Sequence, residues 1–469
     1  MDFHSKLPNF GCCKNIFPMR IVIAGAGEVG SHLAKMLSSS SESNNITVLD
    51  SNPERLEALA GTTDVLTVEG QPSSIEKLKE AGAGKADLFI AVSPAALQDV
   101  NIVSALLAKN LGAKKVAARI NNDEYMKAEN RLLFTSLGID LLFYPEKVAA
   151  EEIYELLKHS ASTEFMDFAQ GKLQMIVFKL DDGASLIGKR PSDFAGKYDP
   201  LPFKVVAISR GGETIIPHTD TKLKMNDLLF MITKKQGVDE LMHFFGKPNI
   251  KITSMMILGG GKIGEFVAAS SSRYTTDIKL IELRKERCTE LSEKLNGVLI
   301  VNGDGRNSDF LIDEGIKNYD AFVAVTSNTE TNILACMIAK RFGVAKTIAE
   351  VENIEYIQLA KNMGVDAVIN KKLITAGRIF KLTLSSKVRN VKYLSGTEAE
   401  VIEYIVNPES KITAAPLKEL GFPKDAIIGG VIRGKESIIA VGDTQIMPYD
   451  KVAVFALPHA VKEVDKFFN

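Results

Sequence analysis

The sequence predicts an α/β protein with two parallel-sheet domains, each followed by a small α+β domain. A glycine turn between an apolar strand and a helical pattern occurs twice, at residues 25–30 and 259–264. Short apolar strands then alternate with helical segments, as in a parallel sheet with helices on both faces. The same order of segments recurs in both halves, so that Gly25 matches Gly259 and Tyr125 matches Tyr356. A repeat of this length indicates an internal duplication.

The elements of each half follow in the same order. The first half contains the strands "RIVIAGAGEVG", "ITVLD", "VLTVEG", "ADLFIAV" and "KKVAARINNDEY", separated by helical segments such as "NPERLEALAG" and "DVNIVSALLAKNLG". The second half contains "SMMILGGGKIG", "IKLIE", "VLIVNGDG", "YDAFVAV" and "AKTIAEVENIEY". Both halves are therefore predicted to be Rossmann-like domains.

A connecting helix and a strand-rich module follow each Rossmann-like domain. In both modules two apolar strands flank an R-G-(G/K)-E turn, which is a hairpin signal, and Arg210 matches Arg433 while Asp227 matches Asp450. The predicted layout is a poorly ordered extension (1–18), Rossmann-like domain (19–140), connecting helix (141–164), small domain (165–248), second Rossmann-like domain (249–366), second connecting helix (367–386) and second small domain (387–469).

The composition is that of an ordinary globular protein and excludes some classes of function. Lys+Arg number 57 and Asp+Glu 58, so there is no net positive charge to neutralise a nucleic-acid backbone. No apolar run approaches the ~20 residues that span a bilayer. Nucleic acid is therefore not an expected partner, and no membrane-spanning segment is predicted.

Each glycine turn predicts a nucleotide site. The glycines let the backbone approach a pyrophosphate, which then meets the N-terminus of the following helix. An acid at the end of the second strand would bind the ribose hydroxyls, and Asp50 and Glu282 stand at these positions. Because an acid repels a 2′-phosphate, NAD or an adenosine nucleotide is favoured over NADP.

The two turns differ in the residue after the middle glycine, which is Glu28 in the first and Lys262 in the second. One hypothesis is that Lys262 favours a more highly charged nucleotide such as ATP. The alternative is ordinary surface variation.

Further candidates follow the later strands of each sheet. Gly70 and Gly303 would permit close approach of an adenine ring, and Asp304 would accept a hydrogen bond from its amino group. Residues at the carboxyl ends of strands four and five complete the set: Val92, Ser93, Val325, Thr326, Arg119 and Glu350. Arg119 could bind a phosphate or form a structural ion pair, whereas its match Glu350 cannot bind a phosphate.

No catalytic or metal-ligating set can be singled out. A dehydrogenase needs a substrate domain that brings an acid or base to the nicotinamide, and the small modules supply no repeated histidine for this. The nucleotide is therefore expected to be sensed and not consumed.

The tandem layout, with "AGAGEVG", "VLD", "FIAVS" and "ARINNDEY" in order, resembles the TrkA family of peripheral, nucleotide-binding subunits of Trk potassium uptake systems. The two kinds of unit resemble the N and C halves of RCK (regulator of potassium conductance) domains. The resemblance covers Met19 to Asn469. It implies that NAD(H) and ATP or ADP bind the Rossmann-like units. It also implies a homo-oligomeric ring on the cytoplasmic face of the plasma membrane, against a membrane-spanning Trk-type transporter subunit.

Carried over by position, the resemblance implicates two sets of residues. The first set is Gly25, Ala26, Gly27, Glu28, Val29, Gly30, Asp50, Val92, Ser93 and Arg119. The second set is Gly259, Gly260, Gly261, Lys262, Ile263, Gly264, Glu282, Val325, Thr326 and Glu350. Two alternatives stay open: a nucleotide-sensing subunit of another cation channel or antiporter, and an NAD-dependent oxidoreductase.

Overall fold

The computed structural model describes residues 19–38, 44–160, 162, 164–168, 171–180, 186–191, 193, 203–211, 213–238, 241, 250–383, 388–393 and 399–468. The extension expected at 1–18 lies outside the described residues. The chain divides into two compact units. One contains the residues up to Ala118 with Leu132–Leu141, and the other contains Arg119–Arg131 with Leu142–Asn469.

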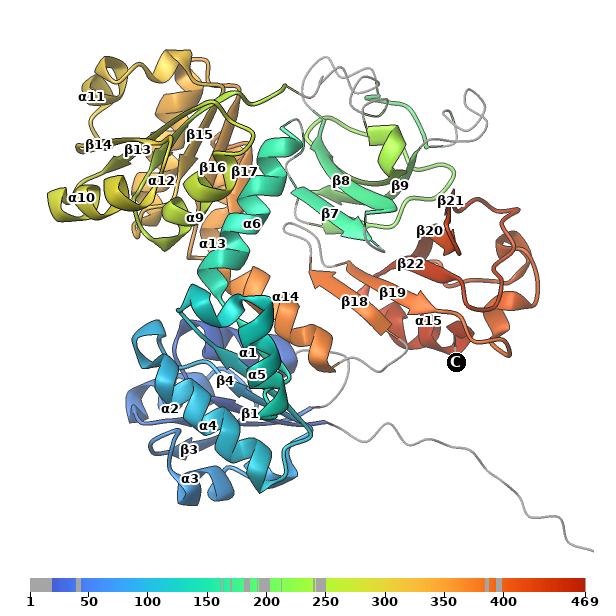
Figure 1. Cartoon of the computed structure of the whole chain (residues 1–469). Coiled ribbons are helices and arrows are strands. Elements are labelled where there is room, and N and C mark those ends of the chain that lie inside the picture. Colours follow the sequence, from blue (N-terminus) through green and yellow to red (C-terminus); the bar gives the residue numbers. More distant parts are fainter. Residues whose placement is uncertain are drawn as a thin grey trace, which may run out of the picture. The chain divides into compact units, whose positions relative to one another are not determined.

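The first Rossmann-like sheet has six strands in the order β3-β2-β1-β4-β5-β6 (Figure 1). Its strands are β1 (Arg20–Ala24), β2 (Asn45–Asp50), β3 (Leu66–Glu69), β4 (Leu88–Ala91), β5 (Lys115–Arg119) and β6 (Leu141–Phe143). Its helices are α1 (Glu28–Ser38), α2 (Pro53–Ala60), α3 (Ile75–Glu80), α4 (Gln98–Leu111) and α5 (Ala128–Ser136). The central strand β1 pairs in parallel with β2 and β4, so the chain reverses direction across the sheet between β1 and β4. Ligands of open α/β sheets bind at this point, beyond the carboxyl ends of the strands.

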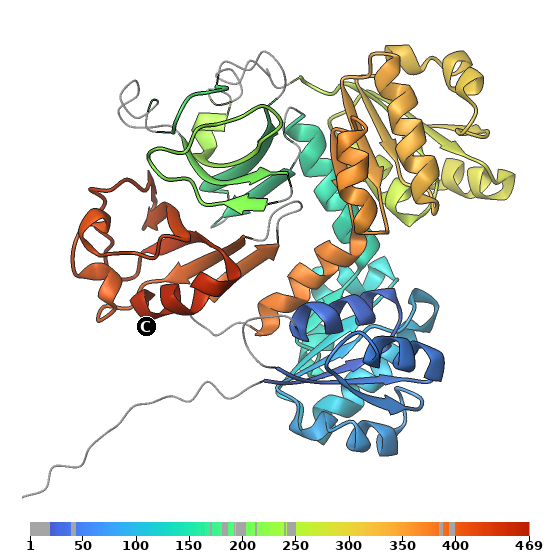
Figure 2. The same cartoon turned by 180° about the vertical axis from the view of Figure 1, so that it is seen from behind.

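The second Rossmann-like sheet repeats this topology in the order β14-β13-β12-β15-β16-β17. Its strands are β12 (Ser254–Leu258), β13 (Asp277–Glu282), β14 (Leu299–Asn302), β15 (Ala321–Ala324), β16 (Lys346–Glu350) and β17 (Ala367–Ile369). Its helices are α9 (Lys262–Ser271), α10 (Lys285–Lys294), α11 (Ser308–Asp313), α12 (Thr329–Arg341) and α13 (Glu355–Asn362). Opposite views show helices in front of each sheet from both sides, as the alternating pattern predicts (Figures 1 and 2).

The two small modules are five-stranded antiparallel sheets with the same strand order, β10-β9-β11-β8-β7 and β21-β20-β22-β19-β18. The first has β7 (Glu164–Phe168), β8 (Leu173–Lys179), β9 (Phe203–Arg210), β10 (Glu213–Ile215) and β11 (Leu228–Lys234). The second has β18 (Val388–Tyr393), β19 (Glu400–Ile405), β20 (Ala426–Arg433), β21 (Glu436–Ile439), β22 (Lys451–Ala456) and α15 (Val461–Phe468). The predicted hairpins are β9–β10 and β20–β21. The matched Arg and Asp residues contact each other, since Arg210 pairs with Asp227 and Arg433 with Asp450, both at 2.8 Å.

The two modules share a hydrophobic core, in which Val206 of the first and Phe455 of the second are fully buried. Lys204 of β9 reaches into the second module and donates to the carbonyl oxygens of Ile428 and Ala440, each at 2.8 Å. This lysine is half-buried, and the desolvation of its ammonium lowers its pKa to about 8. The modules are therefore joined by apolar packing and by hydrogen bonds to backbone.

The connecting helices α6 (Pro145–Lys158) and α14 (Lys371–Thr383) contact each other, and α6 packs along α9. The ring of Tyr144, which precedes α6, meets Phe266 of α9 edge to face with centroids 5.4 Å apart. Val148 and Ile153 belong to the buried face of α6. The first connecting helix thus contacts the helix that follows the second glycine turn.

Candidate functional site

The three glycines of the first turn have different surroundings. Gly25 has a φ of 113°, and a Cβ there would lie 2.7 Å from the backbone nitrogen of Ser93. A Cβ on Gly30 would lie 1.8 Å from the carbonyl oxygen of Gly25, so the helix can approach the strand only without one. A Cβ on Gly27 would meet no atom within 4 Å. The first and third glycines are therefore required by the fold, whereas the middle one leaves space at the start of α1 for a ligand to approach the backbone.

The second turn repeats these three environments. Gly259 has a φ of 111°, and a Cβ on Gly264 would lie 2.0 Å from the carbonyl oxygen of Gly259. A Cβ on Gly261 would again meet no atom within 4 Å. Gly261 is the N-cap of α9 and has no side chain with which to cap the helix, so this residue leaves the first N–H groups of α9 to an anion.

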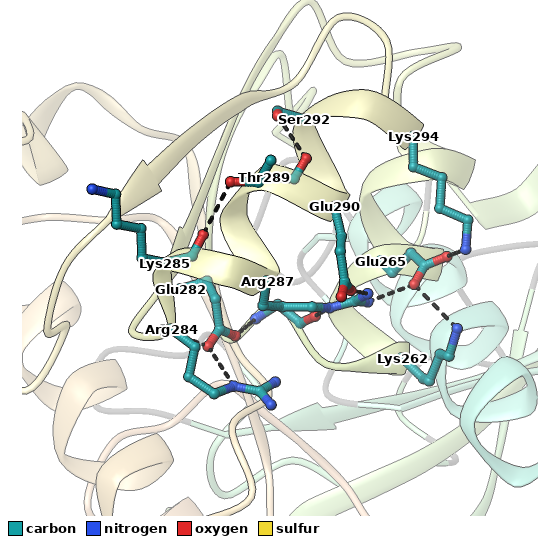
Figure 3. Close-up of polar contacts among 11 residues, drawn as sticks. Lys262, Glu265, Glu282, Arg284, Lys285, Arg287, Thr289, Glu290, Ser292 and Lys294 are labelled. Carbon is teal, nitrogen blue, oxygen red and sulfur yellow. Dashed lines mark hydrogen bonds and ion pairs between the residues drawn. The ribbon is translucent and has the colours of Figure 1, made fainter.

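The predicted ribose acids hold the turns from the neighbouring strand. Asp50 accepts hydrogen bonds from the backbone nitrogens of Ala26 at 2.5 Å and Asn52 at 2.8 Å. Glu282 accepts from the backbone nitrogen of Gly260 at 2.9 Å, and from the backbone nitrogen and Nε of Arg284 at 2.9 and 3.2 Å (Figure 3). A carboxylate has about four acceptor positions, so each acid can order its turn and still accept a ribose hydroxyl.

Both the acid and the turn residue whose backbone nitrogen it binds are different in the two copies: Glu282 with Gly260 in the second, and Asp50 with Ala26 in the first. A Cβ on Gly260 would lie 2.9 Å from Oε2 of Glu282 and 2.6 Å from Cδ1 of Leu291. In the first turn the matching position is Ala26, which is 3% exposed beside the shorter Asp50. The longer acid, Glu282, is thus paired with a glycine, which has no Cβ to clash with it, and the shorter acid, Asp50, is paired with an alanine.

The end of the fourth strand is fixed by a buried asparagine that the sequence analysis does not single out. Asn101 of α4, 1% exposed, accepts from the nitrogen of Ser93 at 2.8 Å and donates to its carbonyl oxygen at 3.1 Å. Asn332 of α12 does the same for Thr326, at 2.9 and 3.0 Å, and also donates to the carbonyl oxygen of Glu350 at 2.9 Å. The sequence does contain a signal that could have identified these residues, because an asparagine occurs at the same place in both repeats, in "DVNIV" and "ETNIL". The predicted Val92 and Val325 beside these loops are buried.

The glycines expected to face adenine are covered by side chains. A Cβ on Gly70 would lie 2.5 Å from Cγ of Lys77, and one on Gly303 would lie 2.1 Å from the ring of Phe310. Asp304 is engaged by Arg306, whose Nε and Nη2 donate to its carboxylate at 2.9 and 2.7 Å. An adenine at either place would have to displace these contacts.

The predicted residues at the end of strand five are held in ion pairs. Nη2 of Arg119 donates to Oε1 of Glu146 at 3.0 Å, which is the structural alternative for this arginine. Glu350, 3% exposed, pairs with Nζ of Lys371 at 2.9 Å, and burial raises its pKa. The two copies therefore carry an ion pair of opposite polarity after strand five.

Lys262 stands at the first position of α9 beside a buried carboxylate. Its Nζ lies 3.4 Å from Oε2 of Glu265. The same Oε2 accepts from Arg287 at 2.6 Å, and Oε1 of Glu265 accepts from Lys294 at 2.6 Å (Figure 3). Burial alone would raise the pKa of Glu265, but the hydrogen bonds from Lys294 and Arg287 outweigh it and lower the pKa. Arg287 further donates through Nε to the carbonyl oxygen of Gly260 at 2.9 Å.

Neither a metal site nor a membrane-spanning helix is found in the part of the chain that the structure describes. Its His, Cys, Asp and Glu side chains form no group of three or more that could hold a metal ion. Within the same residues, no helix has the length and apolarity needed to cross a bilayer.

Among the solved structures that share this fold are two structures of the same channel, GsuK. "GsuK channel bound to NAD" superposes with a TM-score of 0.61 at 18% identity, covering 98% of this chain and 80% of that one. "Crystal Structure of the GsuK RCK domain" gives a TM-score of 0.59 at 17% identity and covers 100% of this chain and 98% of that one. At these identities the likeness establishes the fold, a tandem of RCK-type domains.

Sequence comparison identifies the family. The TrkA-N domain model matches residues 21–145 and 255–371, and the TrkA-C domain model matches 175–246 and 401–469. The Trk system potassium uptake protein TrkA homolog of Archaeoglobus fulgidus is 35% identical over 96% of this chain and 100% of its own length. TrkA of Halomonas elongata is 30% identical over 96% of this chain and 99% of its own length. With both domain types in tandem and relatives aligned over nearly their full length, the chain belongs to the TrkA family of Trk system potassium uptake proteins.

Proposed function

We propose that the chain is the cytoplasmic, nucleotide-binding regulatory subunit of a Trk-type potassium uptake system. It forms a ring of copies on the inner face of the plasma membrane and gates a separate membrane-spanning subunit in response to NAD(H), ATP or ADP. Family membership supports a regulatory role in potassium transport. The nucleotide response rests on the geometry of the two glycine turns.

One observation carries the nucleotide proposal. In each Rossmann-like domain the first and third glycines are required by the fold, whereas a Cβ on the middle one, Gly27 or Gly261, would contact nothing. A glycine that is not needed for packing, at the start of a helix and beside a buried acid, suits the approach of a pyrophosphate. The arrangement occurs twice, with Asp50 and Glu282 as the acids.

Exposed apolar side chains support the proposed ring. Val103 of α4 is 44% exposed, and Leu132 and Leu133 of α5 are 71% and 56% exposed. On the matching helices of the second copy, α12 and α13, Leu334 and Leu359 are 54% and 50% exposed. Apolar residues left exposed on the same helices of both copies are suited to contacts between Rossmann-like domains of neighbouring chains.

Gating follows from differential binding. A nucleotide that binds one arrangement of the ring more tightly biases the transporter towards that arrangement. A shift from 1:99 to 99:1 requires about 5.5 kcal/mol in total. With two sites per chain and several chains per ring, each site need contribute only on the order of 1 kcal/mol.

The test is potassium flux into proteoliposomes that contain the candidate membrane subunit. Flux is compared with and without this chain under ATP, ADP, NADH and no nucleotide. A nucleotide-dependent change that requires this chain is expected, and a double variant, Gly27→Asp with Gly261→Asp, should abolish the nucleotide dependence. If flux ignores the chain under every condition while the two proteins bind each other, the proposed function is wrong.

A further inference from the structure

The two glycine turns are surrounded by different charges. Around the second turn lie four cations (Lys262, Arg284, Arg287 and Lys294) and three carboxylates (Glu265, Glu282 and Glu290), a net charge of +1. The matching positions in the first copy hold Glu28, Asn52, Arg55, Thr62, Ser31, Asp50 and Ala58, a net charge of −1. The turns themselves are built alike, and the residues that differ at the end of strand five are held in an ion pair in both copies, so the charges around the turn are the difference that the phosphates of a ligand would meet.

We propose that the second site prefers a nucleoside triphosphate such as ATP over a dinucleotide such as NAD, and that the first site has the reverse preference. The proposal rests on the proposed nucleotide-binding function and assigns a ligand class to each site. A triphosphate carries more negative charge than the diphosphate bridge of a dinucleotide, so it gains more from a cation at the phosphate position and loses more from a carboxylate there.

Lys262 is available to a ligand because the carboxylate beside it, Glu265, is paired with two other cations. Glu265 is already paired with Arg287 and Lys294 at 2.6 Å, whereas Lys262 lies at 3.4 Å with a side chain that is 48% exposed. The lysine follows Gly261, the glycine at which a phosphate would approach the helix. Its ammonium can therefore move to a phosphate at little cost, while Glu265 keeps two cations.

Arg284 reduces the negative charge at the ribose end of the second site. Its Nε lies 3.2 Å from Oε1 of Glu282, and its side chain is 67% exposed. Both acids accept from two backbone nitrogens, but the residue that matches Arg284 in the first site is Asn52, whose side chain carries no charge. With Glu28 at the start of α1, the first site therefore presents two carboxylates to a ligand, without an arginine at the position of Arg284.

The experiment measures nucleotide affinity at one site at a time in the full chain. Gly27→Asp closes the first site and Gly261→Asp closes the second, because the new carboxylate enters the space for a phosphate. Neither substitution meets an obstacle in the fold, and Asp is a favourable N-cap residue, so folding should be retained, as circular dichroism will verify. Isothermal titration with ATP and with NAD⁺ then gives the ratio of their affinities at each remaining site.

Charge reversal tests the residue that carries the preference. In the Gly27→Asp background, Lys262→Glu should weaken ATP binding by at least about tenfold, the effect of losing one hydrogen bond between charged groups, and NAD⁺ binding by less. Lys285→Glu is the matched control, because it makes the same charge change on a lysine that points away from Lys262 and Glu265 (Figure 3). In the Gly261→Asp background, Glu28→Lys should raise the affinity for ATP.

The outcomes separate this proposal from the proposed function. Equal ATP-to-NAD⁺ ratios at the two sites, or an effect of Lys262→Glu no larger than that of Lys285→Glu, would overturn the preference and leave nucleotide regulation intact. Failure of both nucleotides to bind the unaltered chain would overturn the proposed function as well.

Discussion

The pairing of Gly260 with Glu282 predicts a compensated pair of substitutions. In Gly260→Ala, the new Cβ would lie 2.9 Å from Oε2 of Glu282 and 2.6 Å from Cδ1 of Leu291. Overpacking of this kind costs about 1–3 kcal/mol, and reduced freedom of the unfolded chain returns about 0.4–1 kcal/mol. We expect Gly260→Ala to lower the free energy of unfolding by about 1–2 kcal/mol. A leucine, Leu59, also stands at the sequence position that matches Leu291 in the first copy, whose turn carries Ala26.

Glu282→Asp should rescue the alanine variant, because it recreates the combination of Ala26 and Asp50. In a double-mutant cycle, the two substitutions should show a coupling of about 1 kcal/mol in the stabilising direction. The chain has no tryptophan, so urea denaturation is followed by far-UV circular dichroism. Ala26→Gly in the first copy is the mirror control and should cost less than about 1 kcal/mol. Costs that add to within about 0.5 kcal/mol would refute the steric argument.

Three further predictions concern residues that hold the domains in shape. Asn332→Leu should lower the free energy of unfolding by about 2–4 kcal/mol, because it leaves buried backbone groups unpaired; a change below about 0.5 kcal/mol in urea denaturation would contradict this. Arg210→Met should cost about 2–4 kcal/mol, because Asp227 is fully buried and would lose its cation, and adding Asp227→Asn should recover part of the loss in the same assay. Burial lowers the pKa of Lys204 to about 8, so between pH 8 and its ordinary 10.5 the unfolded chain binds the extra proton, and stability rises with pH across that window. Lys204→Met should flatten this rise in melts recorded from pH 7 to 10.5, and an unchanged slope would show that the lysine is not responsible.

The fold and the glycine turns could be predicted because their signals are local. A strand, a turn with three glycines, a helix and an acid at fixed spacing occur close together, and the second copy repeats them. The structure confirms both parallel sheets and both antiparallel modules. The matches of Arg210 to Arg433 and of Asp227 to Asp450 proved to be two ion pairs, since the repeat preserved both partners of each.

The remaining features depend on contacts between distant residues. Nothing near Arg119 in the sequence indicates that Glu146 is its partner, since α5 and β6 intervene. Similarly, the side chains over Gly70 and Gly303 come from the helices that follow, and only the structure shows them covering the glycines. Lys204 reads as an exposed strand residue until the second module is placed against it.

The two turns differ in the side chains that hold their backbone in place. In the first turn the hydroxyl of Ser31 donates to the carbonyl oxygen of Ala26 at 2.9 Å. Glu265 occupies the matching position in the second turn and cannot donate when ionised, so Arg287 donates to Gly260 instead and pairs with Glu265 as well. Arg287 and Glu265 therefore replace one neutral hydrogen bond with a charged network that holds the same backbone turn. Because that network is complete without the ammonium of Lys262, the lysine is the charge that remains free to act on a ligand.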